Sequence, residues 1–361
     1  MKAIRRGRCR SWPARFGSAV AVLFVVVGLW SCATSGGDTA ARRADGREPV
    51  PGWYEDPNSV YPEEEYLTAI GSGDTRRAAE QDALGAMSQI FEARVSVDNR
   101  VNERYREIAG GSEEFSEREV ELANMVNVRS EQDLMNVQYG ESFTDSDGRV
   151  HVIGYMNRLE TGRIYRDLIE KNASQVDRFV SRAQDETAIM RRFAFAGAAE
   201  IVAQNNRALL DQLRIISPPL AAAINLPYDE QRVTELRSEI ASEMGYRVEV
   251  TGDAAGRVKD TVSEALSEAG FVVSDEGPLR VIGSAELEEA EGGRYEEARW
   301  YLNLRFVGPE GDTVVSYNAQ DRASGINMEA ARAFAFSDME ETARDEFVGR
   351  ITQYFDGLVI Q

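Results

Sequence analysis

The spacing of apolar residues after residue 50 predicts a short strand followed by a helix. Residues 66–70 alternate between two faces, and we expect this strand to end at Gly71 and Gly73, where the backbone is free to reverse. Asp74 is the predicted N-cap of the next helix. The buried face of that helix carries the apolar residues that recur at helical spacing, which are Ala79, Ala83, Ala86, Met87 and Ile90.

The next apolar residues predict further strands and a hairpin. Ala93, Val95 and Val97 alternate as in a strand, and a polar stretch follows through Gly110 and Gly111. The segment from about Leu122 to Tyr139 is again rich in apolar residues. An Asp-Gly turn at 145–148 then precedes an alternating stretch at 150–153, which indicates a hairpin.

A long helical pattern separates this region from a second group of strands. It runs from Glu160 to about Ile216, and a single helix of that length would measure roughly 85 Å. We therefore expect a break or a fold back near Asp185. Pro218 and Pro219 end the pattern, because proline cannot continue a helix.

The C-terminal region repeats the mixture of strands and helices. The pattern predicts a strand at Val248 and Val250 and a helix over 258–269 that Gly270 stops. The further predicted strands are 271–277, 279–287, 300–306 and 313–320. A terminal helix starts near Asn327, and its predicted buried residues are Ala333, Phe336, Ala343, Phe347, Ile351 and Phe355.

Together these patterns predict an α+β fold. We expect two small modules of antiparallel sheet packed with helices and joined by a helical connector. The predicted segments are a signal peptide (1–31), a flexible linker after an acylated cysteine (32–50), an α+β domain (51–172), the connector (173–244) and a second α+β domain (245–361).

The first 31 residues contain basic but no acidic side chains, as in an export signal. The apolar run Ala19–Trp30 that follows the basic residues is too short to cross a bilayer comfortably. Leu29 to Cys32 resemble the lipobox of bacterial lipoproteins, so we predict cleavage before Cys32 and acylation of its thiol. Two or more acyl chains would hold the protein stably at a membrane, with the small polar residues up to Val50 as the linker.

The charge of the chain argues against nucleic acid as a partner. The formal net charge is −20, and loss of the signal with its six basic residues would make it −26. A polyanion is repelled by such a chain unless a basic face overrides the total, and no basic face is visible after residue 15. Cys9 would leave with the signal, so the mature chain would contain neither a disulfide nor a cysteine-based zinc site.

Residues 50–172 carry a family resemblance. The stretches are "PGWY", the strand "YLTAIGSGD", the helix "RRAAEQDALGAMSQI", "ARVSV" and "VIGYMNRLETGRIYRDLIEKN". They resemble the Lpp-twenty family of bacterial envelope lipoproteins. The resemblance implies a small α+β module related to modules of flagellar outer-ring proteins, and a structural, surface-exposed or flagellum-associated role without catalytic residues.

Three motifs resemble chemical sites, but the residues around each favour a structural role. His151 is the only histidine, so any Ser-His-acid or histidine-metal site would need it, and we interpret it as a strand residue. The stretch Gly71–Asp74 suggests a phosphate loop, but Asp74 places a negative charge where phosphate would bind. Asp145, Asp147 and Gly148 suggest a calcium loop, but the first and twelfth positions lack carboxylates.

Acidic and aromatic clusters offer two weaker alternatives. We interpret the acid clusters at 63–65, 113–114 and 288–291 as solvated surface rather than as a glycosidase pair or a cation site. The aromatic residues Trp53, Tyr54, Tyr61 and Tyr66 are expected to pin the start of the module, with an aromatic binding shelf as the alternative. We therefore expect no catalytic residue, no cofactor and no metal, and Cys32 as the lipidation site.

The sequence thus favours a non-catalytic, lipid-anchored envelope protein that makes structural or assembly contacts. Its predicted partners are the membrane, through the acyl chains on Cys32, and envelope or flagellar proteins, with self-association left open. Ala33 lacks the aspartate associated with inner-membrane retention in some bacteria, which favours the outer membrane. The alternative is a periplasmic ligand-binding or carboxylate-dependent hydrolytic protein acting on a cell-wall polymer.

Overall fold

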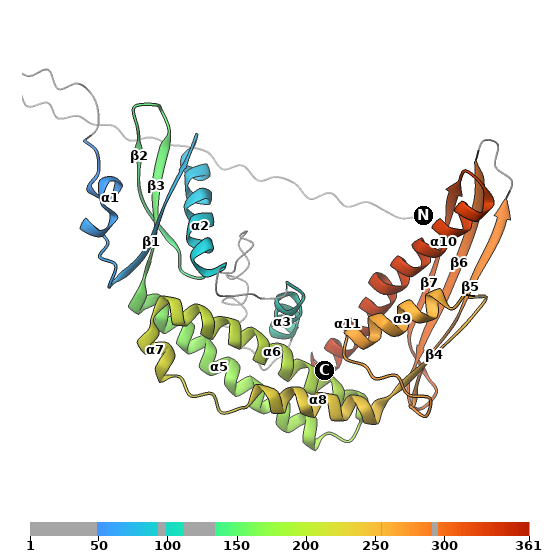
Figure 1. Cartoon of the computed structure of the whole chain (residues 1–361). Coiled ribbons are helices and arrows are strands. Elements are labelled where there is room, and N and C mark those ends of the chain that lie inside the picture. Colours follow the sequence, from blue (N-terminus) through green and yellow to red (C-terminus); the bar gives the residue numbers. More distant parts are fainter. Residues whose placement is uncertain (1–48, 93–98, 112–133, 254, 291–294, 361) are drawn as a thin grey trace, which may run out of the picture. The chain divides into compact units, whose positions relative to one another are not determined.

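The computed structural model describes residues 49–92, 99–111, 134–253, 255–290 and 295–360 (Figure 1). The predicted signal peptide and most of the linker lie outside these residues. The first elements are α1 (Gly52–Glu55), η1 (Pro57–Ser59), β1 (Tyr66–Gly73), α2 (Arg76–Glu92), α3 (Asn99–Gly111), β2 (Gln138–Thr144) and β3 (Val150–Asn157). The middle helices are α5 (Arg158–Asp185), α6 (Ile189–Ile216), α7 (Pro218–Ala223) and α8 (Glu230–Met244).

The C-terminal elements form the second mixed region. They are β4 (Tyr246–Thr251), α9 (Arg257–Glu268), β5 (Leu279–Ala290), β6 (Glu296–Val307), β7 (Thr313–Gly325), α10 (Met328–Thr342), the π-helical turn η2 (Ala343–Phe347) and α11 (Val348–Ile360). Each of the two sheets packs with helices, and the helices α5–α8 lie between the sheets in the chain. The predicted α+β fold is therefore confirmed. Residues 50–361 make up one compact unit. The domain boundaries stay predictions, and α5 runs through the one at residue 172.

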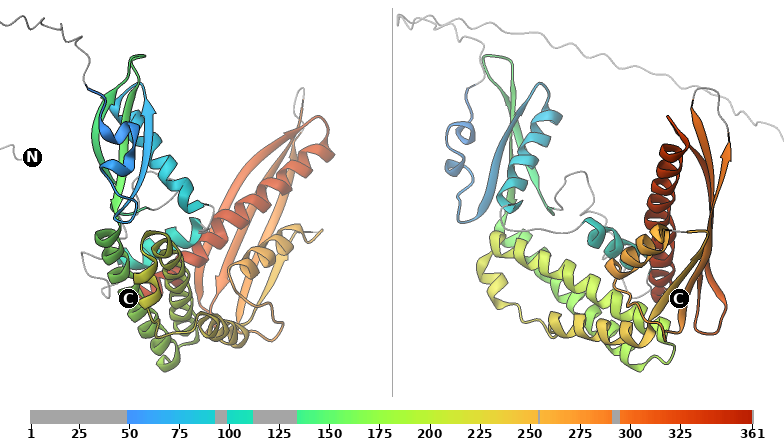
Figure 2. Two further views of the ribbon diagram at one scale, coloured as in Figure 1. Left: turned by 60° about the vertical axis from the view of Figure 1, so that its left-hand side comes forward. Right: turned by 45° about the vertical axis from the view of Figure 1, so that its right-hand side comes forward.

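The first sheet has the order β1-β3-β2 and is antiparallel throughout. The predicted hairpin is confirmed, with Gly148 in the left-handed conformation (φ +83°) that glycine adopts without strain. The predicted break near Asp185 is also confirmed, because α5 ends there and α6 begins at Ile189. The two helices lie side by side as a hairpin (Figures 1 and 2).

β1 ends at Gly73, as predicted, but Gly71 lies within the strand rather than at its end. Both glycines are buried. A Cβ on Gly71 would lie 2.1 Å from the carbonyl oxygen of Ala79 and 2.1 Å from the backbone nitrogen of Ala83. These glycines therefore let α2 lie directly against the strand, and close approach rather than a turn explains them.

The N-cap of α2 and the last residue of its buried face each lie one position after the predicted residue. Thr75 caps the helix instead of Asp74, since its Oγ1 accepts a hydrogen bond from the backbone nitrogen of Ala78 at 3.2 Å. Ile90 is 37% exposed, whereas the neighbouring Phe91 is buried. The buried row is Ala79, Ala83, Met87 and Phe91, which keeps a strict four-residue spacing along the side that faces the sheet.

α3 lies where the sequence predicted a polar stretch. Tyr105, Ile108 and Ala109 are buried in the main apolar cluster, and polar residues between them cover the exposed side. The predicted strand at Ala93, Val95 and Val97 lies outside the described residues, as does most of the segment from Leu122 to Tyr139.

The second sheet has the order β4-β5-β6-β7, and its first pair is parallel. It is therefore a mixed sheet rather than the predicted antiparallel one, because the chain crosses over through α9 between β4 and β5. The predicted strand at 271–277 is wrong. This segment forms only one bridge, Tyr246 to Val273, before the chain turns at Gly277 against Gly245.

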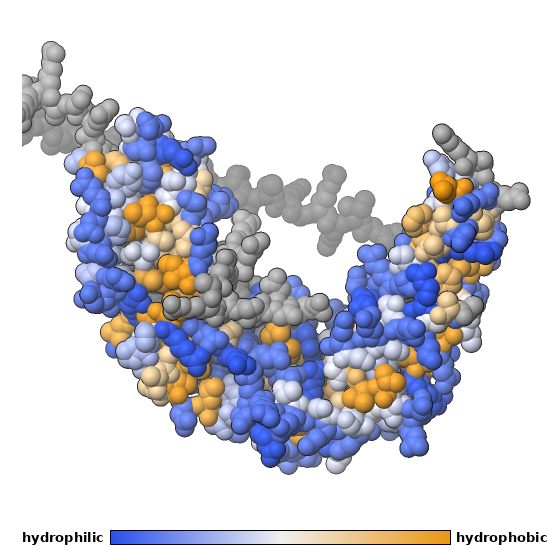
Figure 3. Space-filling view, viewed as in Figure 1, coloured by the Kyte–Doolittle hydropathy of each residue, from blue (hydrophilic) through white to orange (hydrophobic). Residues whose placement is uncertain are grey.

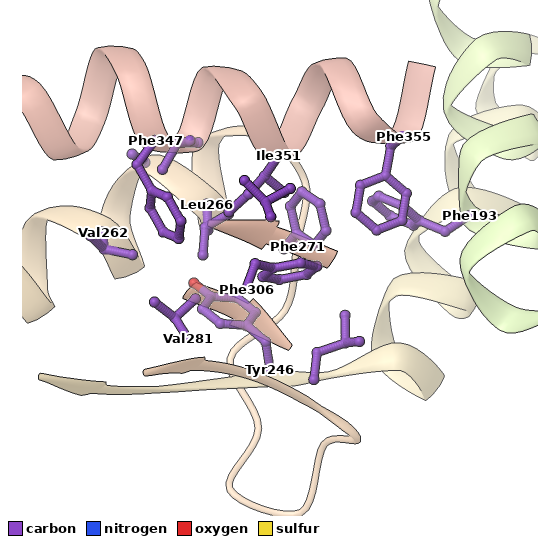
Figure 4. Close-up of a cluster of buried hydrophobic side chains, with 14 of the residues drawn as sticks. Phe193, Tyr246, Val262, Leu266, Phe271, Val281, Phe306, Phe347, Ile351 and Phe355 are labelled. Atoms are coloured by element: carbon purple, nitrogen blue, oxygen red, sulfur yellow. The ribbon is translucent and has the colours of Figure 1, made fainter. Parts of the chain in front are cut away.

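The main core lies between this sheet and the helices (Figure 4). Phe193 of α6 lies with its ring centroid 4.8 Å from that of Phe271 and 5.3 Å from that of Phe355 of α11. Phe306 of β6 completes the cluster against Phe355 at 6.2 Å. Helix α6 therefore shares one core with the C-terminal sheet and helices.

The C-terminal helix begins as predicted, since the Asn327 side chain accepts a hydrogen bond from the backbone nitrogen of Ala330. Ala333 is exposed, contrary to the prediction, and Phe336 is half-buried. One row of buried positions keeps a four-residue spacing and consists of Ala331, Ala335, Met339, Ala343, Phe347, Ile351 and Phe355. Val348, Asp356 and Val359 are buried as well. An α-helix of about 3.6 residues per turn rotates such a row away from its partner, and the wider π turn rotates it back.

Replacement of Gly71 by alanine should destabilise the protein, because the new Cβ meets backbone atoms that cannot move aside. We expect a loss of about 1–3 kcal/mol or more in the free energy of unfolding, measured by urea denaturation followed by circular dichroism. Gly85→Ala is the matched control, since Gly85 lies in α2 with open space around it and should gain about 0.5–1 kcal/mol. Equal stability of the two variants would contradict this explanation.

Candidate functional site

The predicted aromatic residues hold the start of the folded chain on the first sheet. Trp53 is buried, and the ring centroid of Tyr54 lies 5.0 Å from Phe143 and 4.8 Å from His151. The rings pack against one another and against the sheet. This arrangement matches the predicted pinning role better than an open binding shelf.

A second aromatic pair continues the same contact along the chain. Tyr61 lies 4.7 Å from Tyr155 of β3 and 5.4 Å from Tyr66 of β1. Burial raises the pKa of the Tyr61 hydroxyl, and the nearby Tyr155 and Tyr66 hydroxyls add to this. Residues 53–61 are thus fixed to all three strands of the first sheet.

His151 forms a pair with Asp145 at the hairpin. Its Nε2 lies 2.8 Å from Oδ2 of Asp145, and its side chain is 13% exposed. Ser72 lies directly opposite His151 in the sheet, but its hydroxyl accepts a hydrogen bond from Arg149 at 3.3 Å. Within the described residues no hydrogen bond joins Ser72 to His151, so these three side chains do not form a Ser-His-acid relay there.

The two loop motifs have structural partners of their own. The backbone nitrogen of Ser72, which a phosphate would need, donates to Oδ2 of Asp82 at 2.8 Å. Asp145 accepts hydrogen bonds from the backbone nitrogens of Asp147 and Arg149, both at 2.9 Å, as in a tight turn. Across the part of the chain that the structure describes, no three histidine, cysteine or acidic side chains gather as a metal site would require.

The acid clusters lie on the surface where they are described. Glu63, Glu64 and Glu65 are exposed. Glu288 accepts a hydrogen bond from the Tyr301 hydroxyl at 3.2 Å, and Glu289 forms an ion pair with Arg332. Residues 113–114 and 291 lie outside the described residues. The described acids therefore do not converge on a common point.

A cavity of about 690 Å³ is the feature that the sequence did not reveal. It is lined by α3, α6, α8, α9, η2 and α11. Arg104 of α3 donates two hydrogen bonds to Asp356 of α11, from Nη2 at 2.7 Å and from Nε at 3.1 Å. The Asp356 side chain is 8% exposed, so this is a largely buried bidentate pair.

A second buried pair also lines the cavity. Arg237 of α8 pairs with Glu200 of α6, which also accepts a hydrogen bond from the Thr234 hydroxyl at 3.1 Å. The Arg237 guanidinium donates to the carbonyl oxygen of Ala269 and lies 5.3 Å from the ring centroid of Phe193. Arg104 and Arg237 each bind a carboxylate of another helix, and Nε of Arg237 is buried without a hydrogen-bond partner. The charged pairs of the cavity lining therefore join helices to one another.

No sequence signal marks these pairs. Arg104 and Asp356 are 252 residues apart, and each lies in a helix whose other charged residues are solvated. Only knowledge that α3 is a helix and that it packs against α11 would have brought them together.

Most of the described surface visible in Figure 3 is hydrophilic, with separate apolar groups between the charged ones. None of the helices in the described part has the length and hydropathy needed to cross a bilayer. Cys32 and the predicted signal peptide lie outside the described residues, so the lipidation site stays a prediction.

Comparison with known proteins identifies a family for the first region. Residues 51–153 match the family model of the LPP20 lipoprotein. This confirms the predicted resemblance over the first sheet and its covering helix, although the match ends before residue 172. No protein among the curated ones matches the chain.

Solved structures with similar arrangements have low identity to this chain. The secreted protein HP1454 from Helicobacter pylori is 13% identical, with 79% of this chain and 98% of that chain covered and a TM-score of 0.38. A minor lipoprotein from Acinetobacter baumannii is 11% identical over 32% of this chain and 92% of its own, with a TM-score of 0.23. A PelC dodecamer from Paraburkholderia phytofirmans is 15% identical over 28% and 88%, with a TM-score of 0.21.

The Asp145 pair should make stability depend on pH in the acid range. The hydrogen bond from His151, with those from the Arg149 and Asp147 backbone nitrogens, lowers the pKa of Asp145 below its ordinary value. A carboxyl whose pKa is lower in the folded state stabilises the fold above its unfolded pKa of about 3.9, and this contribution is lost as the pH falls through the folded pKa.

We therefore expect Asp145→Asn to lower the thermal midpoint at neutral pH, and the difference from the natural protein to shrink as the pH falls through the lowered, folded-state pKa of Asp145. Circular dichroism melts across this range measure the difference. Asp147→Asn is the control, because that exposed side chain has no described partner in the turn. A constant difference between Asp145→Asn and the natural chain at all pH values would contradict the assignment.

Proposed function

We propose that this chain is a non-catalytic, lipid-anchored protein of the cell envelope whose folded part makes structural or assembly contacts. The observation that carries the proposal is the match of residues 51–153 to the LPP20 lipoprotein model. That match begins directly after the predicted lipidation site at Cys32 and its linker. A folded lipoprotein module in this position is what an acyl tether would hold at a membrane.

The geometry at the start of the fold supports a tethered role. The linker would meet the folded chain at Pro51, and Trp53 and Tyr54 fix the next residues to the first sheet. The linker would therefore join the folded part of the chain at residues that are packed against the first sheet. The proposed location is the outer membrane, because Ala33 rather than aspartate follows Cys32.

The contacts that we propose are with envelope proteins, among them flagellar components, or with a second copy of the chain. The support is the family resemblance together with exposed apolar side chains, the most exposed being Ile326 at 83%. Burial of such a side chain by a partner would be favourable, because its apolar area would leave water.

Cys32→Ala should abolish incorporation of labelled fatty acid in cells, because the only thiol that would carry acyl chains is then gone. Cys9→Ala is the matched control, since the other cysteine lies in the predicted signal and should leave labelling unchanged. An uncleaved signal would itself hold the protein at a membrane. The Cys32→Ala chain is therefore also placed behind an ordinary cleavable export signal, where it should appear in the soluble fraction.

Persistent labelling of Cys32→Ala would overturn the anchor. Membrane retention of the version with the cleavable signal would do the same, because neither result requires a lipid on Cys32.

A photo-crosslinking residue at Ile326 should capture a neighbouring envelope protein or a second copy in intact cells. Glu310, in the turn between β6 and β7, serves as an exposed control position with no apolar character. The adducts are identified by gel mobility and mass spectrometry. An uncross-linked monomer at Ile326, or the same adducts from both positions, would count against the assembly role.

A further inference from the structure

The second sheet has one covered and one open face. Alternate residues of β6, such as Trp300 and Leu304, are buried under the helices, which lie along one side of the sheet (Figure 2). The residues between them point to the other side, and Arg299, Asn303 and Arg305 are exposed. No described helix covers these positions.

The open face holds arginines that lack an acidic partner, in a chain with net charge −20. Arg280, Arg299 and Arg305 form no side-chain hydrogen bond or ion pair with any described residue. Most of the other described arginines bind a carboxylate or a carbonyl oxygen. Exposed exceptions elsewhere include Arg77 and Arg163 on helices α2 and α5, and Arg350, which lies over the Tyr317 ring.

The strand register leaves positive charges facing one another. Arg299 lies directly opposite Arg322 of β7, and Arg280 lies directly opposite Arg247 of β4. Like charges in such pairs are destabilising. Glu297 and Glu249 form ion pairs with Arg322 and Arg247, at 3.8 and 3.0 Å, and neither acid forms an ion pair with Arg299 or Arg280.

Arg299 has an acid close to it, although the two form no ion pair. Glu288 lies opposite Arg299 in the sheet and accepts the hydrogen bond of the Tyr301 hydroxyl, so its charge partly compensates that of Arg299. Glu286 and Glu288 both lie toward the far end of β5, so the uncompensated charge is greatest around Arg280 and Arg305. An anion bound there would relieve the repulsion within the sheet.

The other side chains of the open face, and the spacing of its arginines, indicate which class of anion would bind there. Neutral hydrogen-bonding side chains stand between the arginines, and they are Ser284, Asn303, Asn318, Ser316 and Gln320. The acids Glu286, Glu288 and Glu297 lie on the same face toward its other end, away from Arg280 and Arg305. Arg299 and Arg305 are separated by about 20 Å along β6, whereas double-stranded DNA carries a charge every 1.7 Å or so. A protein interface would need a buried aromatic or aliphatic centre, and this face offers little beyond Ile282 and Tyr301.

We propose that the open face of the β4–β7 sheet binds a linear acidic polysaccharide. The arginines would bind its spaced carboxylates, and the amide and hydroxyl side chains would bind its sugar hydroxyls. This proposal does not rest on the proposed assembly role. Binding of a defined polymer to the purified protein tests it without any envelope partner. The overall negative charge opposes the polymer at long range, so binding weakens as salt competes for the few arginine contacts.

The test measures binding of polygalacturonate oligomers to the full purified chain by calorimetry at low ionic strength. We expect saturable binding that Arg280→Gln/Arg305→Gln weakens by about tenfold or more, since two charged contacts are lost. Arg77→Gln/Arg163→Gln is the matched control and should bind as the natural chain does. Asn303→Asp, which adds a negative charge between the arginines, is a second variant and should also weaken binding.

Neutral dextran, polyglutamate, single-stranded DNA and anionic lipid vesicles serve as comparison ligands. The proposal is overturned if the natural chain does not bind polygalacturonate, or if the control variant loses as much affinity as the test variant. It is equally overturned if dextran binds as tightly, or if one of the other anions binds more tightly through the same arginines. Circular dichroism of each variant establishes that the fold is intact.

Discussion

The packing of Phe193 against Phe271 and Phe355 is the contact on which the C-terminal half of the structure depends. It brings α6, the loop after α9 and α11 into one core, so the helical hairpin and the second sheet cannot be separated without exposing aromatic surface. Full burial of one such side chain contributes about 1.5–3 kcal/mol, and ring pairs add roughly 0.5–1.5 kcal/mol each. Burial of this aromatic cluster therefore stabilises the observed packing of α6 and α11 against the second sheet.

Buried polar contacts then select one arrangement among those that such a core would allow. The bidentate Arg104–Asp356 pair joins α3 to α11, and Asn206 of α6 donates to the carbonyl oxygen of Ile169 and to the Tyr228 hydroxyl. Breaking one partner of a buried pair costs about 3–5 kcal/mol, although the intact pair adds little net stability. These contacts therefore act mainly by making shifted packings unfavourable.

Local sequence patterns predicted the elements whose signals are local. The hairpin at Asp145–Gly148, the break at Asp185 and the Asn327 cap follow from residues that are close in sequence, and all three are confirmed. Strand β6 was predictable for the same reason, because one buried face gives strict alternation. The Gly71 interpretation failed because its cause is the later approach of α2.

The candidate site was less predictable because its parts are distant in the chain. α3 reads as polar, since only a narrow stripe of it is buried, and the Arg104–Asp356 pair depends on where that helix packs. The open face of the second sheet needed the strand register, which places Arg299 beside Arg322. Thr75 rather than Asp74 as the cap shows that neighbouring capping residues are hard to separate from sequence alone.

The π turn at Ala343–Phe347 has a consequence for how this chain tolerates change. It accommodates one residue more than a regular turn, and thereby reduces the angle by which the row of buried residues from Ala331 to Phe355 winds around the helix axis. The length of the helix between Asn327 and Ile360 is therefore constrained by the packing of its buried row. Substitutions along the outer side of this helix are free to accumulate, whereas insertions and deletions within it would put its two halves out of phase.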